Sequence, residues 1–124
     1  MTRTIFNGGA WTKGRYTSFV TSALRAASRR WPPKYQVLNE AKTEKKTNQK
    51  TGRLAQHYRC FSCSNEFTST DVQVDHIIPI GKDKTWDEFI DALFCEKDNL
   101  QVLCTTCHKK KSKLERQDAN QSKN

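Results

Sequence analysis

Two pairs of cysteines constrain this chain more than any other feature of its sequence. Cys60 and Cys63 form one Cys-x-x-Cys pair, Cys104 and Cys107 form a second, and 40 residues lie between the pairs. Each pair can give two thiolates to one tetrahedral Zn²⁺, which is a strong signal for a structural zinc site. The gap is longer than in compact zinc ribbons. The chain is therefore expected to fold around a zinc site that encloses further structure.

The second pair is followed by His108, and Cys-x-x-Cys-His is also the attachment signature of c-type haem. The haem interpretation is disfavoured because residues 1–15 contain no apolar run long enough for a signal peptide, and because the only methionine is Met1. The same lack of an export signal argues against disulfides. The fifth cysteine, Cys95, lies beside Phe94 in an apolar stretch and is expected to be a small buried residue rather than a reactive thiol.

Charge is distributed unevenly along the 124 residues, which carry a net charge of +9. Residues 1–53 contain 12 Lys/Arg and 2 Asp/Glu, residues 54–103 contain 4 and 9, and residues 104–124 contain 6 and 2. Basic flanks favour a polyanionic partner, and nucleic acid is the leading candidate, although a solvated surface would give the same pattern. No apolar stretch is long enough to span a membrane, so no membrane partner and a cytoplasmic location are expected.

The N-terminal part of the sequence predicts two helices and a linker. Apolar residues at helical spacing predict a helix over residues 17–31, with Thr17 or Ser18 as N-cap, and a short second helix over residues 32–42. Residues 42–53 lack apolar periodicity and contain many lysines, which predicts a basic linker or loop. Three basic residues on the outer face of the first helix are candidate DNA contacts, namely Arg25, Arg29 and Arg30.

The segment between the cysteine pairs predicts two strands and a helix. Residues 54–60 read as a strand that leads into the first pair, and residues 70–80 as a strand that stops near His76 because Pro79 follows. Residues 85–94 predict a helix with one buried apolar face. That face consists of Trp86, Phe89, Ile90, Leu93 and Phe94.

The C-terminal segment predicts a last helix over residues 105–116, with Leu114 turned to the core, followed by a disordered tail over residues 117–124. A basic stripe on this helix supplies further candidate DNA contacts, namely Lys109, Lys113 and Arg116. His57 precedes the first pair by three residues, and because both zinc pairs are already complete it is interpreted as structural or DNA-contacting.

A second group of polar residues is not needed by zinc and so indicates a second function. Asp75, His76 and Asn99 lie between the pairs, and His108 follows Cys107. The Asp75 carboxylate and the His108 imidazole suit a divalent ion such as Mg²⁺ or Mn²⁺, which leaves His76 to act as a base. Adjacent strand residues face opposite ways, so Asp75 and His76 serve one site only if the strand ends or twists there. Singly, each residue also has an ordinary structural explanation.

Three motifs together resemble a known family. "VDHIIP" at 74–79, "DNLQVLC" at 98–104 and "CHKKK" at 107–111 are similar to the HNH endonucleases of the ββα-metal group, over roughly residues 54–116. The stretch "RRWPPKYQVLNEAK" is similar to small phage-encoded members. The resemblance implies an α+β fold, with a ββα-metal core stapled by a Cys₄ zinc site. Its domains would be a basic helical extension (1–53), the nuclease domain (54–116) and the tail (117–124).

The resemblance also implies the role of each site residue. His76 would be the general base, Asp75 and His108 would hold the catalytic Mg²⁺ or Mn²⁺, and Asn99 would orient the loop or the His76 ring. Hydrolysis of DNA would leave 5′-phosphate and 3′-hydroxyl ends, by nicking or double-strand cleavage, in a monomer or homodimer in the host cytoplasm. The alternatives are a non-catalytic zinc module that binds DNA, as a regulator or packaging accessory, and a junction-resolving nuclease.

Overall fold

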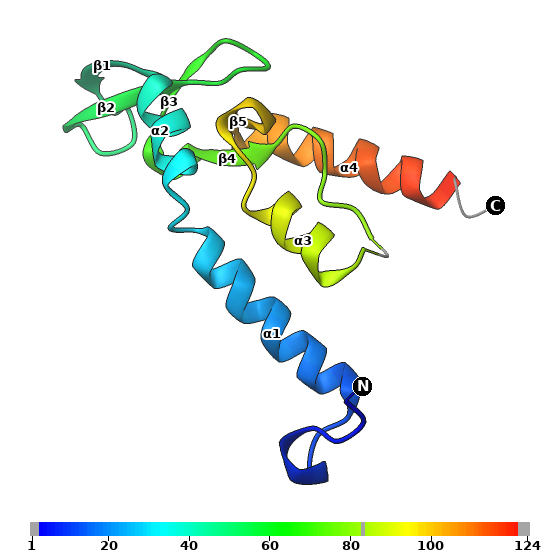
Figure 1. The fold of residues 1–124 in the computed structure, drawn as a ribbon. Coiled ribbons are helices and arrows are strands. Elements are labelled where there is room, and N and C mark those ends of the chain that lie inside the picture. The colour runs from blue at the N-terminus through cyan, green and yellow to red at the C-terminus, as the bar shows by residue number, and fades with distance from the viewer. Residues whose placement is uncertain (1–2, 83, 122–124) are drawn as a thin grey trace. The chain divides into compact units, whose positions relative to one another are not determined.

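The computed structural model describes residues 3–82 and 84–121 (Figure 1). The chain divides into two compact units, which we call the first unit (Met1–Trp31 with Ile80–Phe94) and the second unit (Pro32–Pro79 with Cys95–Asn124). Each unit combines residues of the predicted N-terminal extension with residues of the predicted nuclease domain. Among the described residues, no helix combines the length and apolarity needed to cross a bilayer.

The first unit is built from two helices, α1 (Lys13–Ser28) and α3 (Trp86–Leu93), with a short 3₁₀ turn η1 (Asn7–Gly9) before them. The α1 helix begins earlier than the sequence predicted, because Thr12, and not Thr17 or Ser18, is its N-cap. The Thr12 hydroxyl accepts a hydrogen bond from the backbone N–H of Arg15 at 3.1 Å. Residues 13–15 contain no apolar side chain, so the helical pattern could not reveal this first turn.

Helix α3 begins with a capping box, in which Thr85 and Glu88 exchange two hydrogen bonds of 3.2 Å. Its predicted apolar face is only partly buried. Leu93 is buried, whereas Trp86 and Ile90 are 43% and 37% exposed. The prediction of a fully buried stripe is therefore wrong at the N-terminal end of the helix. Near the C-terminal end, the ring of Phe94 packs edge-on against Trp31, with ring centroids 5.6 Å apart.

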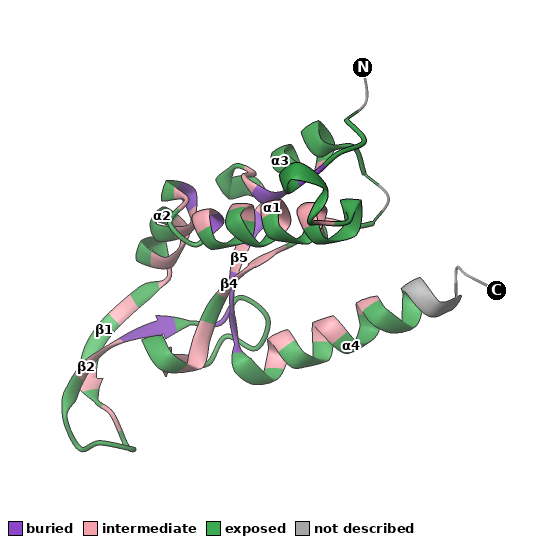
Figure 2. Cartoon of the chain, turned by 90° about the horizontal axis from the view of Figure 1, so that it is seen from below, coloured by how far each residue is buried: buried purple, intermediate pink, exposed green. Residues whose placement is uncertain are grey.

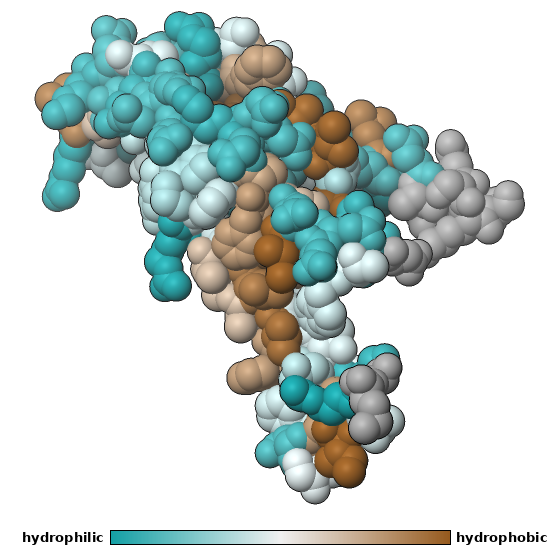
Figure 3. Space-filling model, in the orientation of Figure 1, coloured by the Kyte–Doolittle hydropathy of each residue, from teal (hydrophilic) through white to brown (hydrophobic). Residues whose placement is uncertain are grey.

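The second unit contains an antiparallel sheet of order β1-β2-β3, with β1 at Lys42–Thr47, β2 at Leu54–Arg59 and β3 at Glu66–Thr68. The predicted linker over 42–53 is therefore wrong in its first half, which pairs with β2. The loop closes where the Gly52 N–H donates to the Asn48 carbonyl at 2.7 Å. Strand β1 has no alternation of apolar residues and is held by its pairing with β2. Its residues are polar, and Figure 3 colours residues by hydropathy.

A second antiparallel pair carries the core of this unit. Strand β4 (Val72–His76) pairs with β5 (Leu100–Cys104), so that Val72 lies opposite Cys104 and His76 opposite Leu100. Every β5 residue except Gln101 is buried (Figure 2). Helix α2 (Pro32–Glu40) and helix α4 (Thr105–Gln121) both contact this pair. Two 3₁₀ turns, η2 (Ser69–Asp71) and η3 (Lys97–Asn99), immediately precede β4 and β5.

Helix α4 begins directly after Cys104 and continues to Gln121. Residues 117–121 are therefore helical where the sequence predicted a disordered tail, and residues 122–124 lie outside the described residues. Leu114 is 61% exposed, so the prediction that it turns to the core is wrong. Within the helix, residues 113, 114 and 116–118 are exposed. Figure 1 shows the course of α4.

Candidate active site and metal centre

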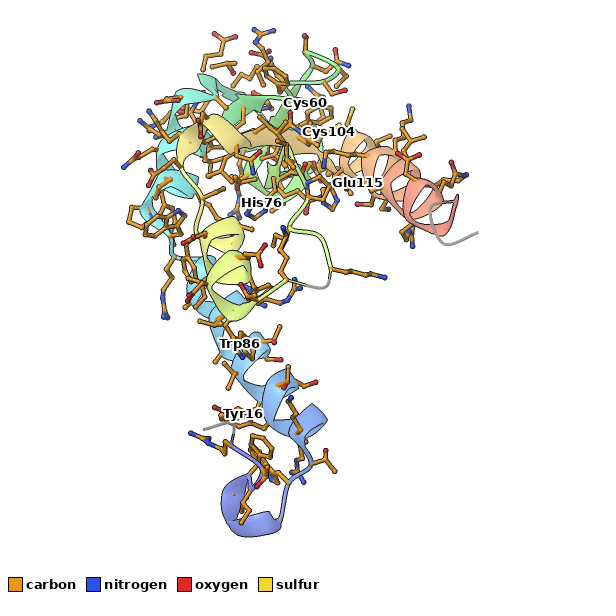
Figure 4. All side chains as sticks on the ribbon, turned by 45° about the vertical axis from the view of Figure 1, so that its right-hand side comes forward. Tyr16, Cys60, His76, Trp86, Cys104 and Glu115 are labelled. Atoms are coloured by element: carbon orange, nitrogen blue, oxygen red, sulfur yellow. The ribbon has the colours of Figure 1, made fainter. Side chains whose placement is uncertain are left out.

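The four paired cysteines converge on one point of the second unit. Cys60 and Cys63 come from the loop after β2, Cys104 ends β5, and Cys107 lies in the first turn of α4. Their sulfur atoms all lie within 4.8 Å of one another. A tetrahedral zinc site with Zn–S bonds of about 2.3 Å needs sulfurs about 3.8 Å apart. The cluster therefore fits a zinc ion, and Figure 4 labels Cys60 and Cys104 within it.

The backbone around the cysteines explains how the loop meets the strand. The N–H of Phe61 donates to the carbonyl of Val102 on β5 at 2.8 Å, and the N–H of Ser64 donates to Cys60 at 2.9 Å. Ser64 adopts a positive φ of 63°, which turns the chain sharply after the second cysteine. Cys60 and Cys104 are buried at the centre of the apolar cluster. The strand and the loop thus bring the sulfur atoms of the two pairs close together.

The thiols of this cluster differ in acidity. Burial opposes ionisation of Cys60, but backbone N–H donors of Cys63, Cys104 and Ser62 outweigh it and lower the pKa of this thiol to about 6. At Cys107, the hydrogen bond with Cys104 and partial burial raise the pKa to about 12. One thiolate is therefore favoured and a neighbouring one opposed, as expected for sulfurs that need a cation to ionise together.

A second polar cluster lies where β4 faces α4, and it brings together Asp75 and His108. The Nε2 atom of His108 is 3.5 Å from the Oδ1 atom of Asp75. The Asp75 side chain is only 13% exposed. Its other oxygen, Oδ2, accepts a hydrogen bond from Nε2 of Gln101 at 3.3 Å. A carboxylate oxygen and an imidazole nitrogen converging from two elements are a donor pair that suits Mg²⁺ or Mn²⁺.

His76 is the last residue of β4, so the regular alternation of the strand ends where the predicted base stands. Asn99 fixes the loop that follows. Its backbone carbonyl accepts from the N–H of Ile77 at 2.9 Å, and its side chain accepts from the N–H of Ile78 at 2.9 Å. The Asn99 amide also donates to the carbonyl of Ile78 at 3.3 Å. These contacts are those of a residue that orients the loop after His76 (labelled in Figure 4).

Two residues of this cluster were missed by the sequence analysis, Gln101 and Lys111. The Nζ atom of Lys111 is 3.0 Å from Oδ2 of Asp75 and donates to the carbonyl of His76 at 2.9 Å. Burial opposes the charged form, but contacts with Glu115 and Asp75 outweigh it and raise the pKa of Lys111. Lys111 lies three residues after His108, which places both on one helix face. This i, i+3 spacing was the signal in the sequence that could have pointed to Lys111.

The predicted DNA contacts are exposed and not ion-paired with any carboxylate of the described residues. They comprise Arg25, Arg29 and Arg30 in the first unit, and Lys109, Lys113 and Arg116 on α4. Arg25 stacks over the ring of Phe89 at 5.7 Å, which leaves the edge of its guanidinium open. By contrast, lysines of the second unit such as Lys46 and Lys50 are paired with acids.

The sequence left open the roles of two residues, His57 and Cys95, and their surroundings favour a structural role for both. His57 is buried in β2, and its Nδ1 lies 2.9 Å from the carbonyl oxygen of Ala55. This favours the structural interpretation of His57. Cys95 is half-buried, and burial raises the pKa of its thiol, which disfavours a reactive thiolate.

Comparison with known proteins relates part of the chain to a family. Residues 60–114 match the family model described as HNH endonuclease, a segment that runs from the first zinc-pair cysteine through β5 and into α4. No curated protein and no solved structure matches the chain.

Proposed function

We propose that the protein is a metal-dependent DNA endonuclease that leaves 5′-phosphate and 3′-hydroxyl ends, and the match of residues 60–114 to the HNH endonuclease family model supports this proposal. The observation that carries this proposal is the pairing of Asp75 with His108 at 3.5 Å, beside His76 at the end of β4. A zinc module that only bound DNA would have no need of a carboxylate held against an imidazole next to the strand end that carries His76.

In the proposed mechanism His76 accepts a proton from the attacking water, and an imidazole suits this task because it titrates near pH 6.5. Asp75 and His108 would hold the catalytic Mg²⁺ or Mn²⁺, which supplies charge stabilisation at the phosphate and the leaving oxygen. Asn99 keeps the loop after His76 in one position through its two side-chain bonds to Ile78. A positioned base contributes roughly 10²–10⁴ in rate.

The proposed DNA contacts are exposed basic residues, and each unit carries its own set. In the first unit, stacking on Phe89 restricts Arg25 without using its N–H donors, so these donors remain free for a phosphate. On α4, the exposed Lys109 and Lys113 lie on the same helix as His108.

A single active site favours nicking of one strand, and double-strand cleavage would need a dimer or two successive events. A phage origin is part of the same proposal.

The test is relaxation of supercoiled plasmid by zinc-loaded protein in Mg²⁺, Mn²⁺ or EDTA. We expect metal-dependent nicking that His76→Ala abolishes and that the exposed β4 substitution Gln73→Ala preserves. Both variants must keep zinc and bind DNA. If wild type and both variants bind DNA equally and none cuts with any ion, the non-catalytic zinc module is the correct function. A strong preference for branched over linear DNA would identify a junction-resolving nuclease.

A further inference from the structure

One lysine of α4 differs from its neighbours in what it contacts. Lys111 is the half-buried one, with a side chain 22% exposed, whereas Lys109, Lys110 and Lys113 are exposed. Its Nζ atom meets three acceptors, namely Oδ2 of Asp75 at 3.0 Å, the carbonyl of His76 at 2.9 Å, and Oε2 of Glu115 at 2.8 Å. The Lys111 ammonium is therefore paired with Oδ2 of Asp75, which is a proposed metal ligand.

The contacts of Asp75 divide into two sides. Its Oδ1 faces His108 at 3.5 Å, and this is the side where a divalent ion would bind. Its Oδ2 faces Lys111 and Gln101. A metal ion on Oδ1 and an ammonium on Oδ2 would be two like charges on one poorly solvated carboxylate, and they repel each other strongly there.

Glu115 offers the ammonium an alternative. It lies one helical turn beyond Lys111 and already forms an ion pair with it at 2.8 Å. Because the lysine side chain is long and flexible, its ammonium can turn toward Glu115 without losing a charged partner. Asp75 has no second lysine to replace Lys111. Among the described residues, its cationic neighbours are Lys111 and, when protonated, His108.

From these contacts we propose that Lys111 is the resident cation of the active site. It balances Asp75 when no metal is bound, and it shifts toward Glu115 when a divalent ion binds Asp75 and His108. This inference rests on the proposed function, because it takes Asp75 and His108 as metal ligands. It makes Lys111 and Glu115 a pair that sets the affinity of the site for metal.

The pair predicts effects of opposite sign. Lys111→Met removes the competing cation and should tighten Mn²⁺ binding about tenfold, since one neighbouring charge alters a carboxylate's proton affinity by about one to three orders of magnitude. Glu115→Gln leaves the ammonium with Asp75 as its one carboxylate partner among the described residues, and it should weaken Mn²⁺ binding several-fold. Lys111→Arg keeps the charge and should stay near wild type.

Matched controls separate the local effect from a change in overall charge. Lys110→Met and Asp118→Asn make the same charge changes at exposed positions of α4. Neither should alter Mn²⁺ affinity by more than about twofold at 0.15 M salt, because both side chains are exposed to a screening solvent and neither forms an ion pair with the described residues of the site. Zinc content and circular dichroism establish that each variant is folded.

The experiment titrates Mn²⁺ into the zinc-loaded full chain without DNA, and free Mn²⁺ is followed by electron paramagnetic resonance. His108→Ala locates the ion. If wild type binds Mn²⁺ and His108→Ala does not, opposite shifts for Lys111→Met and Glu115→Gln support the proposal, and unchanged or equal shifts overturn it alone. If His108→Ala binds as well as wild type, or neither binds, the proposed metal site fails, and this inference fails with it.

Discussion

Glu66 on β3 lies between two cations, Lys46 and Arg59. The hydrogen bond from Lys46, aided by both positive charges, holds the pKa of Glu66 below its ordinary value. A lowered carboxyl pKa stabilises the fold above the unfolded pKa of about 4.3 and ceases to do so as the pH falls through the lower folded value. Glu66→Gln should therefore be less stable than wild type at pH 7, with the difference shrinking below about pH 4. Urea unfolding across this range checks it.

Glu44→Gln is the matched control, because Glu44 is exposed on neighbouring β1 and has no ion pair among the described residues. Acid also releases zinc, so the variants are compared only at pH values where metal analysis shows that each of them retains it. A stability gap for Glu66→Gln that does not shrink toward the acid end of this range would show that the carboxylate charge is not its cause.

Asn99 allows activity to be separated from stability. Asn99→Ala loses two side-chain bonds to Ile78, which should lower stability by about 1–2 kcal/mol. Cleavage should fall more, about 10²-fold, because small displacements near a reacting group are costly. Asn99→Asp keeps the acceptor for the Ile78 N–H and should be intermediate. Nicking rates and thermal unfolding measure both effects, and a loss of stability without a loss of rate would exclude a positioning role.

The sequence motifs predicted the site residues Asp75, His76, Asn99 and His108. In the structure, Oδ1 of Asp75 lies 3.5 Å from Nε2 of His108. Lys111 could not be singled out in the same way, because it is one of four lysines within residues 109–113. Only the packing of α4 against β4 determines which of the four meets Asp75. The spacing of residues along a helix shows which side chains share a face, but it does not show which residues of another element contact that face.

Among the elements, the start of α1 depends on a single cap. Thr12→Ala removes the acceptor for the Arg15 N–H and should destabilise the protein by about 1 kcal/mol. Ser18→Ala, at a position that the sequence suggested as the cap, should be neutral or slightly stabilising because it lies inside the helix. Thermal unfolding of both variants tests the corrected boundary, and a larger loss for Ser18→Ala than for Thr12→Ala would contradict it.

Elements with an apolar pattern, such as β4 and α3, were predictable because burial imposes that pattern on the sequence, whereas β5 was not predicted. Strand β1 was not, because it is an edge strand with a polar sequence and is held by pairing with β2. Lysines on an edge strand also oppose pairing with another chain. Its charge therefore suggested a linker, although in the structure Lys46 of β1 and Lys50 of the following loop each form an ion pair with an acid.

For the molecule as a whole, uncompensated charge should determine DNA affinity. Changing Arg25, Arg29 and Arg30 together to Gln should weaken binding and lower the slope of log K against log salt by about 0.9 for each phosphate that the variant no longer neutralises. Changing Lys46, Lys50 and Lys97 to Gln removes the same charge, but each of these lysines is paired with an acid, and the slope should hardly change. Fluorescence anisotropy at several salt concentrations measures both. Equal slopes for the two triple variants would show that net charge alone drives binding.

Zinc removal tests the scaffold on which the proposed active site stands. The ion would tie the loop after β2 to β5 and α4, which are segments 40 residues apart in sequence. Structural zinc contributes about 10–16 kcal/mol, comparable to the whole stability of a typical domain, about 5–15 kcal/mol. Cys104→Ser, or a strong chelator, should therefore abolish cooperative unfolding of the second unit and DNA cleavage with it. Cys95→Ser, outside the cluster, should retain zinc and both properties. Metal analysis with calorimetry decides the matter, because an apoprotein that unfolds at the wild-type temperature would mean that the buried strands, and not the ion, hold Asp75 against His108.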